Sequence, residues 1–190
     1  MHIELTDHLR CPREHAEAFL VLLPDRMDQR RIMAGHLGCP VCGWSTAWSD
    51  GIPDFGDSWR GVGALPFDAA AAHAMLGLDG PGGWVALGGN AGALGLELAK
   101  LLPGVSFVAV TPPPEVQSTN SLSVLLSGTW PLKTHSMRGV ILGSDAAIWR
   151  DTAMRSALPG LRTGGVGEAP SEDSTRLLGN ADGVWVARQR

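Results

Sequence analysis

The 190-residue sequence has no tyrosine, no excess of basic residues and no long hydrophobic run. A membrane-spanning helix needs about twenty consecutive apolar residues, so no membrane span is expected. The formal net charge is −4, with five basic against nine acidic residues up to Asp57 and ten against ten from Ser58 onward. A nucleic-acid-binding protein normally shows a basic excess, so RNA or DNA is not expected as the main ligand.

The N-terminus and the cysteine content also exclude some classes of protein. The N-terminus lacks a basic region followed by an apolar one, so no secretory signal is expected. Cys11, Cys39 and Cys42 are the only cysteines, and three cysteines cannot all pair within one chain. Their spacing indicates metal binding rather than a disulfide framework, and we expect a reducing, cytoplasmic compartment.

The cysteines lie in a pattern that predicts a zinc site. Residues 39–43 read Cys-Pro-Val-Cys-Gly, which is typical of a zinc knuckle because glycine permits the tight reversal. A structural zinc ion takes four tetrahedral nitrogen or sulfur ligands. The knuckle and Cys11 supply three, and we predict His15 as the fourth, with Glu14 and His36 as alternatives. If no metal binds, the cysteines are small buried apolar groups.

A small β-sheet is predicted around this site. Residues 18–23 and 31–34 have the pattern of two strands, and residues 24–29 are predicted to form the turn between them. So small a sheet has a thin core, and a bound metal would add to its stability.

The rest of the chain is organised around residues 82–95, which contain six glycines. The stretch predicts a buried strand over residues 85–87, a glycine turn, and a helix ending near Leu102. Gly88 and Gly92 allow a tight backbone, and Asn90 tolerates a positive φ. A strand that feeds a helix through such a turn is typical of the start of a nucleotide-binding βαβ unit.

Strands and helices alternate beyond this turn, which predicts a mostly parallel, doubly wound α/β sheet. We predict helices over residues 66–78 and 144–157, strands over 105–110, 122–126, 138–143 and 183–187, and a turn over 161–165. The last strand is expected at or near a sheet edge. Ser144 or Asp145 is predicted to cap its helix. Thr111 and Ser127 are further candidates near the carboxyl ends of strands, where ligands bind in such sheets.

Residues 5–12, 37–43 and 49–55 carry a resemblance to a known family. The last of these reads Ser-Asp-Gly-Ile-Pro-Asp-Phe. Together they resemble the small zinc-ribbon-like activator of tRNA and protein methyltransferases. The resemblance implies a zinc-ribbon-like β module over residues 1–57. Its first Cys-x-x-Cys is altered here, because Glu14 stands where the second thiol would be.

Residues 58–190 are similar to class I S-adenosylmethionine-dependent methyltransferases of type 11. The similarity is carried by residues 85–92, by Trp-Pro-Leu at 130–132 and by Leu-Arg-Thr-Gly-Gly at 161–165. It implies a truncated Rossmann-like methyltransferase domain with S-adenosylmethionine as the methyl donor. The donor-binding positions carried over are Gly88, Asn90, Gly92 and Thr111.

The departures from that family are concentrated in the donor site. Ala86 and Thr111 stand where the family has acidic residues, and Asn90 replaces the middle glycine. Residues 112–120, which begin with three prolines, leave little room for a helix. A threonine offers the ribose less than a carboxylate does, and losing a charge-assisted contact costs about 1.5–3 kcal/mol.

The sequence therefore predicts a degenerate methyltransferase-like protein, a pseudoenzyme that acts as a binding or assembly subunit with a protein partner. The alternative is an active methyltransferase on a small molecule or a protein. Methyl transfer needs alignment of donor and acceptor more than a conspicuous base, so the missing base is not decisive. A nucleic-acid-binding role for Arg26, Arg30 and Arg31 ranks last because of the charge balance.

Overall fold

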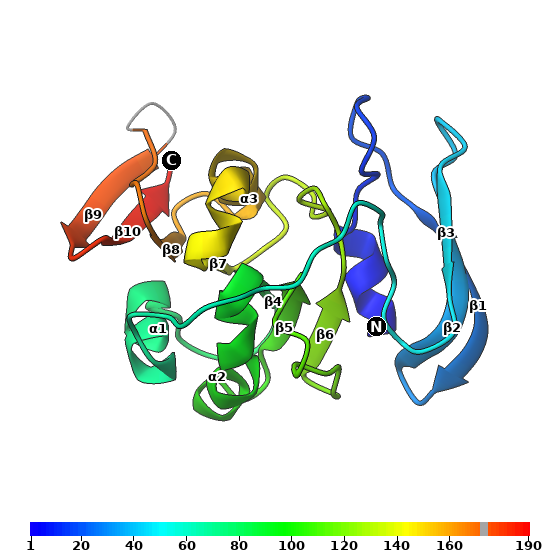
Figure 1. Ribbon diagram of the computed structural model, residues 1–190, viewed down its shortest axis with the longest axis horizontal. Coiled ribbons are helices and arrows are strands. Elements are labelled where there is room, and N and C mark those ends of the chain that lie inside the picture. Colours follow the sequence, from blue (N-terminus) through cyan, green and yellow to red (C-terminus); the bar gives the residue numbers. More distant parts are fainter. Residues whose placement is uncertain (172–174) are drawn as a thin grey trace.

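The computed structural model describes residues 1–171 and 175–190 and contains two β-sheets (Figure 1). The smaller sheet is antiparallel and follows a short 3-10 helix. These elements are η1 (Ile3–His8), β1 (Val21–Asp28), β2 (Arg31–Gly38) and β3 (Ser45–Trp48), with strand order β1-β2-β3. The β module expected at the N-terminus is therefore present.

The hairpin of this small sheet turns later than predicted. Asp28 pairs with Arg31, so the loop is only Gln29 and Arg30, and β1 runs straight through Pro24. A strand tolerates proline at a sheet edge, where the missing N–H faces no neighbour. β1 is an edge strand, and irregular register between Pro24 and Met27 accommodates the ring. The turn predicted over residues 24–29 was thus wrong.

The larger sheet has seven strands in the order β6-β5-β4-β7-β8-β10-β9. The strands from β6 to β8 are parallel, and β10 is antiparallel to both β8 and β9. Their bounds are β4 (Trp84–Gly88), β5 (Ser106–Val110), β6 (Leu122–Leu125), β7 (Gly139–Leu142), β8 (Arg162–Val166), β9 (Thr175–Ala181) and β10 (Val184–Gln189). The expected α/β class with a mostly parallel sheet is confirmed.

Two elements at the C-terminal end differ from prediction. Residues 162–166 form strand β8 rather than a turn, and β9 was not foreseen. The glycines that suggested a turn serve packing instead, because a Cβ on Gly165 would lie 2.6 Å from the Trp185 ring. β10 lies one strand in from the edge, between β8 and β9.

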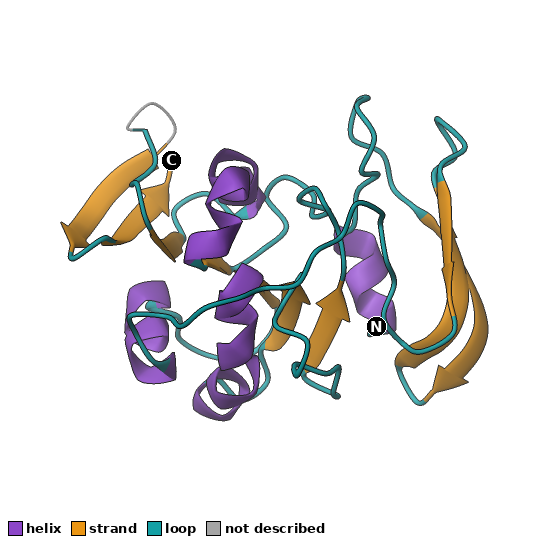
Figure 2. Ribbon diagram, viewed as in Figure 1, coloured by secondary structure: helices purple, strands orange, loops and turns teal. Residues whose placement is uncertain are grey.

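Short helices connect the strands (Figure 2). They are α1 (Ala69–Leu76), η2 (Gly89–Leu94), α2 (Gly95–Leu101), η3 (Ser144–Trp149) and α3 (Arg150–Ser156). α1 begins later than predicted, because the Asp68 side chain accepts the N–H of Ala71 and caps it. Among the described residues, none of the helices combines the length and apolar character needed to cross a bilayer.

The two faces of the larger sheet are covered differently. One face packs on α1 and α2 through residues such as Leu76, Leu98 and Phe107. The other face shares a single core with the N-terminal module, which includes Leu5 and Leu9. Covering both faces is what a parallel sheet with apolar strands requires. The module thus takes part in the main core, while the boundary at residues 57/58 remains a prediction.

Backbone pairing also joins the module to the sheet. The N–H of Phe55 donates to the carbonyl of Leu126 over 2.8 Å, and the N–H of Leu126 donates to Pro53 over 3.0 Å. The N–H of Gly128 then donates to Gly56 over 2.8 Å. Residues 53–56 therefore lie parallel to residues 126–128, the segment that directly follows β6.

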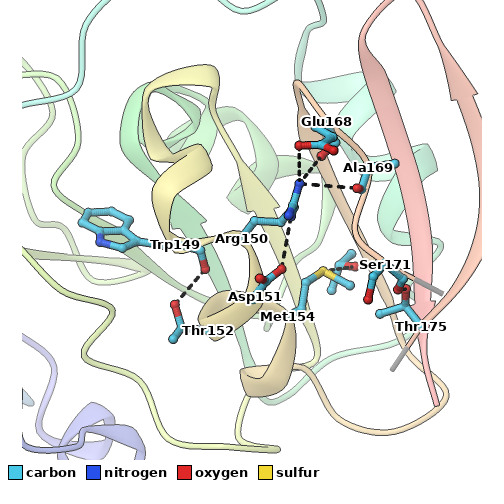
Figure 3. A network of polar contacts seen from close by, with 10 residues as sticks. Trp149, Arg150, Asp151, Thr152, Met154, Glu168, Ala169, Ser171 and Thr175 are labelled. Atoms are coloured by element: carbon cyan, nitrogen blue, oxygen red, sulfur yellow. Dashed lines mark hydrogen bonds and ion pairs between the residues drawn. The ribbon is translucent and has the colours of Figure 1, made fainter. Parts of the chain in front are cut away.

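A polar network fixes α3 to the segment after β8 (Figure 3). The Arg150 guanidinium lies 3.1 Å from the Asp151 carboxylate and 3.3 Å from that of Glu168. It also donates to the carbonyls of Glu168 and Ala169. Beside it, the Thr175 hydroxyl donates to the carbonyl of Ser171 over 2.8 Å, which ties the start of β9 to the same region.

The shared core predicts that the module and the sheet unfold together. Leu5→Ala removes a fully buried side chain from this core, so we expect a loss of about 2–5 kcal/mol in the free energy of unfolding. Urea unfolding followed by tryptophan fluorescence and by far-UV circular dichroism should give one coincident transition. Ile148→Ala, at a side chain 83% exposed, is the control and should change stability by less than about 0.5 kcal/mol. Two separate transitions, with only the first shifted by Leu5→Ala, would contradict the shared core.

Candidate functional site

The structure brings together the four predicted metal ligands Cys11, His15, Cys39 and Cys42, with donor atoms all within 4.8 Å of one another. The Sγ atoms of Cys11 and Cys42 are 3.6 Å apart, and Cys39 Sγ is 3.3 Å from His15 Nε2. Two thiolates on one tetrahedral zinc ion are separated by about 3.8 Å. This set of three sulfurs and one nitrogen is therefore compatible with Zn²⁺.

The side chain of His15 is oriented for such a role. Its Nδ1 is 2.7 Å from the carbonyl of Ala16, an arrangement that places the proton on Nδ1 and leaves the Nε2 lone pair facing the thiols. The two alternative ligands lie elsewhere. His36 is 3.1 Å from the Asp25 carboxylate, and Glu14 lines a separate cavity.

The knuckle backbone favours a thiolate at Cys39. Burial acts to raise the pKa of this thiol, but the N–H groups of Cys42 and Val41 and the neighbouring thiols outweigh it and lower the pKa to about 6. Burial raises the pKa of Cys11 to about 12. A metal ion binds the deprotonated form, so the knuckle supplies one ligand already disposed to lose its proton.

The predicted donor-site residues gather at the carboxyl ends of β4 and β5. Gly88, Asn90, Gly92 and Thr111 are all buried, and Gly88 ends β4 where it pairs with Val110. The close approaches that the glycines permit are to the protein itself. A Cβ on Gly88 would lie 2.7 Å from Leu142, and one on Gly92 would lie 2.5 Å from Pro112.

Residues 59–63, which we call the strap, lie across this glycine turn. The N–H of Gly61 donates to the carbonyls of Thr111 (3.0 Å) and Pro112 (3.2 Å). A Cβ on Gly61 would lie 2.8 Å from the backbone nitrogen of Asn90, so only glycine allows the strap this close. The Asn90 side-chain amide also approaches the carbonyl of Gly63, at 3.4 Å.

Asp145 fixes the strap to the turn, a role that the sequence did not reveal. Its carboxylate accepts the N–H of Val62 at 2.8 Å and the N–H of Asn90 at 2.9 Å. Gly143 is the N-cap of η3 and no side chain caps that helix, so the helix-capping prediction for Ser144 or Asp145 was wrong. The local sequence cannot distinguish an acidic residue that caps a helix from one that holds a distant segment. The residues that Asp145 binds, Val62 and Asn90, are 83 and 55 positions away in the sequence.

Thr111 is held by Ser127, which lies just past the end of β6. Its hydroxyl donates to the carbonyl of Ser127 at 2.9 Å and accepts the N–H of Ser127 at 3.1 Å. Its φ is 52°, a left-handed conformation that β-branched residues rarely adopt. The proton and one of the two oxygen lone pairs of the predicted ribose contact are therefore already used within the protein.

An aromatic cluster continues the strap into the core. The ring centroids of Trp59 and Trp149 are 5.1 Å apart, and those of Trp149 and Trp130 are 5.8 Å apart. The indole N–H of Trp149 donates to the carbonyl of Gly128. Stacked and tilted aromatic pairs add stability beyond their buried area. The strap is thus anchored by a side chain as well as by its backbone.

The metal cluster gives a direct prediction. We expect protein purified without chelator to contain one zinc ion per chain by elemental analysis, and Cys39→Ser and His15→Ala to lower that content because each removes a tetrahedral ligand. His36→Ala is the matched control and should retain the metal. Equal zinc content in all three variants would contradict this ligand set.

No protein-family model matches the chain, and no curated protein matches it. Solved structures of methyltransferases are similar to it in part. The antibiotic-resistance methyltransferase Kmr is 12% identical with a TM-score of 0.43, over 70% of this chain and 99% of Kmr. The Thermus thermophilus 16S rRNA methyltransferase RsmC is 13% identical with a TM-score of 0.35, over 90% of this chain and 44% of RsmC.

A chain of the complex between the Haloferax volcanii Trm112 methyltransferase activator and a methyltransferase is also similar. It is 19% identical with a TM-score of 0.40, over 52% of this chain and 51% of that one. The present chain thus spans about half the length of the Haloferax chain it matches.

Proposed function

We propose that this protein is a methyltransferase-like pseudoenzyme that does not use S-adenosylmethionine and acts as a binding or assembly subunit. The observation that supports it most strongly is the strap. Gly61 and Val62 hydrogen-bond to the groups around the glycine turn at 2.8–3.2 Å, and Asp145 accepts N–H groups from both the strap and the turn. A nucleoside placed over Gly88 would have to displace this segment.

The chemistry of the ribose contact supports the same proposal. An adenosine sugar presents two hydroxyl groups, which a carboxylate at the end of β5 would accept as charge-assisted hydrogen bonds. Thr111 stands there, uncharged and already bonded to Ser127. Freeing its hydroxyl would break two hydrogen bonds in a buried place, at a cost of about 1–3 kcal/mol for each unsatisfied group.

Zinc has a structural role in this proposal. The four ligands join the segment that follows η1 to the knuckle after β2, and Cys11 and Cys39 belong to the core shared with the sheet. Zinc bound there would hold the module against the sheet and would catalyse nothing, because four protein ligands leave no open position. We place the protein in the cytoplasm, where thiols remain reduced.

A protein partner is supported by the outer surface of the module. Five apolar side chains are exposed there on β1 and in the loops beside β1 and β2, and we call them the β1 patch. They are Phe19 (64% exposed), Val21, Leu23 (62%), Met27 and Val41 (63%). β1 is also an edge strand whose outer backbone groups have no neighbouring strand among the described residues. Exposed apolar side chains of this kind suit a protein partner that covers them.

The proposal predicts no donor binding. Calorimetric titration of the full chain with S-adenosylmethionine should show no saturable heat up to about 1 mM. A dissociation constant above that concentration means a binding free energy weaker than about −4 kcal/mol. Micromolar binding to the unmodified protein would overturn the proposal and favour an active methyltransferase acting on a small molecule or a protein.

The Asp145→Ala variant distinguishes two explanations for the absence of S-adenosylmethionine binding: a site that has lost its contacts, and an intact site that the strap covers. The variant removes the acceptor of the Val62 and Asn90 N–H groups, so hydrogen exchange at those amides should become faster. We expect the variant still not to bind S-adenosylmethionine, because Thr111 is unchanged. Donor binding that appears only in Asp145→Ala would mean that the site is intact beneath the strap, and the pseudoenzyme proposal would fail.

The β1 patch can be tested separately. A partner captured from the native organism by the tagged full chain should be lost with Leu23→Glu, which places a charge at the most exposed of the apolar patch residues on β1. Ile148→Glu changes an equally apolar, exposed side chain on η3 and should keep the partner. Capture that is indifferent to both changes would assign the interaction to another surface.

A further inference from the structure

A cavity beside the amino end of β6 has no part in the function proposed above. It is separate from the glycine turn, which lies at the carboxyl end of β4. It has a volume of about 620 Å³ and lies where the start of β2, helix α2 and the loop before β6 meet. Its lining residues are Arg31, Leu96, Ala99, Lys100, Ser118, Thr119, Asn120 and Ser121. A smaller cavity of about 160 Å³ shares Arg31 and Asn120 with it and adds His2, Gln29 and Arg30.

The charge of this joint cavity is the reverse of that of the whole chain. The chain carries 19 acidic residues and a net charge of −4, yet within residues 1–171 and 175–190 no carboxylate lines either cavity. Arg31 and Lys100 face no acidic side chain within 4.0 Å among the described residues, while Arg30 pairs with Glu4. Lys100 also lines a neighbouring hollow, together with Asp68 and Glu97. Arg31 is therefore the positive charge that belongs to the joint cavity alone, and Lys100 lies between this cavity and the acidic hollow.

Arg31 is fixed in place but not fully used. Its Nη2 donates to the carbonyl of Ser118 over 3.2 Å, which ties the side chain to the loop before β6. Its Nε is buried and has no hydrogen-bond partner among the described residues. The two Nη groups carry four of the five guanidinium N–H donors, and the contact with Ser118 is their one hydrogen bond among the described residues. The remaining Nη donors can therefore bind an anion.

Two hydroxyl groups of the loop keep a proton to donate. Ser118 Oγ accepts the N–H of Val124 over 2.9 Å, and Thr119 Oγ1 accepts the N–H of Leu122 over 3.2 Å. A hydroxyl oxygen that accepts a backbone N–H still has its own proton to donate. Neither hydroxyl donates to an acceptor within the part of the chain that the structure describes. An anionic oxygen would satisfy these protons.

We propose that this cavity binds the phosphate group of a small phosphorylated molecule. Arg31 and Lys100 would neutralise the phosphate charge, and the hydroxyls of Ser118 and Thr119 would donate to its oxygens. Leu96 and Ala99 form an apolar wall that suits an uncharged body such as a nucleobase. The loop precedes β6, whereas the glycine turn follows β4, so binding here is independent of whether S-adenosylmethionine binds.

Calorimetric titration of the full chain with AMP, and separately with inorganic phosphate, tests the site. We expect saturable binding of AMP that weakens as sodium chloride is raised, because salt screens the charge–charge attraction. Lys100→Gln should weaken it about tenfold through the loss of one charged contact. Arg176→Gln removes the same charge from β9, at the far edge of the sheet, and should leave the affinity unchanged.

Arg31→Lys provides a second test, because it keeps the charge but removes the planar fork. We expect a weaker but measurable affinity for AMP and the same unfolding midpoint within the error of the measurement. Absence of saturable binding at millimolar AMP and phosphate would overturn the proposal. So would equal weakening by Lys100→Gln and Arg176→Gln, or binding of a single-stranded RNA oligonucleotide without binding of AMP.

Discussion

The structure depends on covering both faces of a parallel sheet whose central strands are almost completely buried. Strands β4, β6 and β7 are buried at every residue, so neither face can be left to solvent. Helices α1 and α2 cover one face. Residues 126–138, which follow β6, contain no helix that could cover the other face. That face is covered by α3 together with η1 and the other N-terminal core residues. The module is therefore a structural part of the sheet domain as well as the element that carries the candidate metal ligands.

The parts of this fold that sequence reasoning found are those with a local signal. Continuous apolar runs predicted β4 to β7 because a strand buried on both faces needs them. The Cys-x-x-Cys knuckle with Cys11 and His15 predicted residues that the structure does bring together. In both cases, neighbouring residues in the sequence carry most of the information.

The parts that it missed depend on distant contacts. Gly164 and Gly165 look like a turn until the Trp185 side chain is placed against them. Pro24 looks like a strand end until β1 is known to lie at an edge. Asp145 has the local pattern of a helix cap, and only the folded chain brings Val62 and Asn90 to its carboxylate. The strained φ of Thr111 is likewise imposed by its tertiary surroundings, since threonine would not choose it locally.

The pairing of residues 53–56 with the backbone beyond β6 has a consequence for self-association. An open sheet normally exposes two rows of unpaired backbone groups, each a template for the strand of another molecule. Here the chain shields part of one row with its own backbone, near the carboxyl end of β6. The opposite row, on β9, carries the charged Arg176 and polar Asn180, which discourage a flat intermolecular ladder. The two borders of the larger sheet are thus protected differently, by chain connectivity at one and by side-chain chemistry at the other.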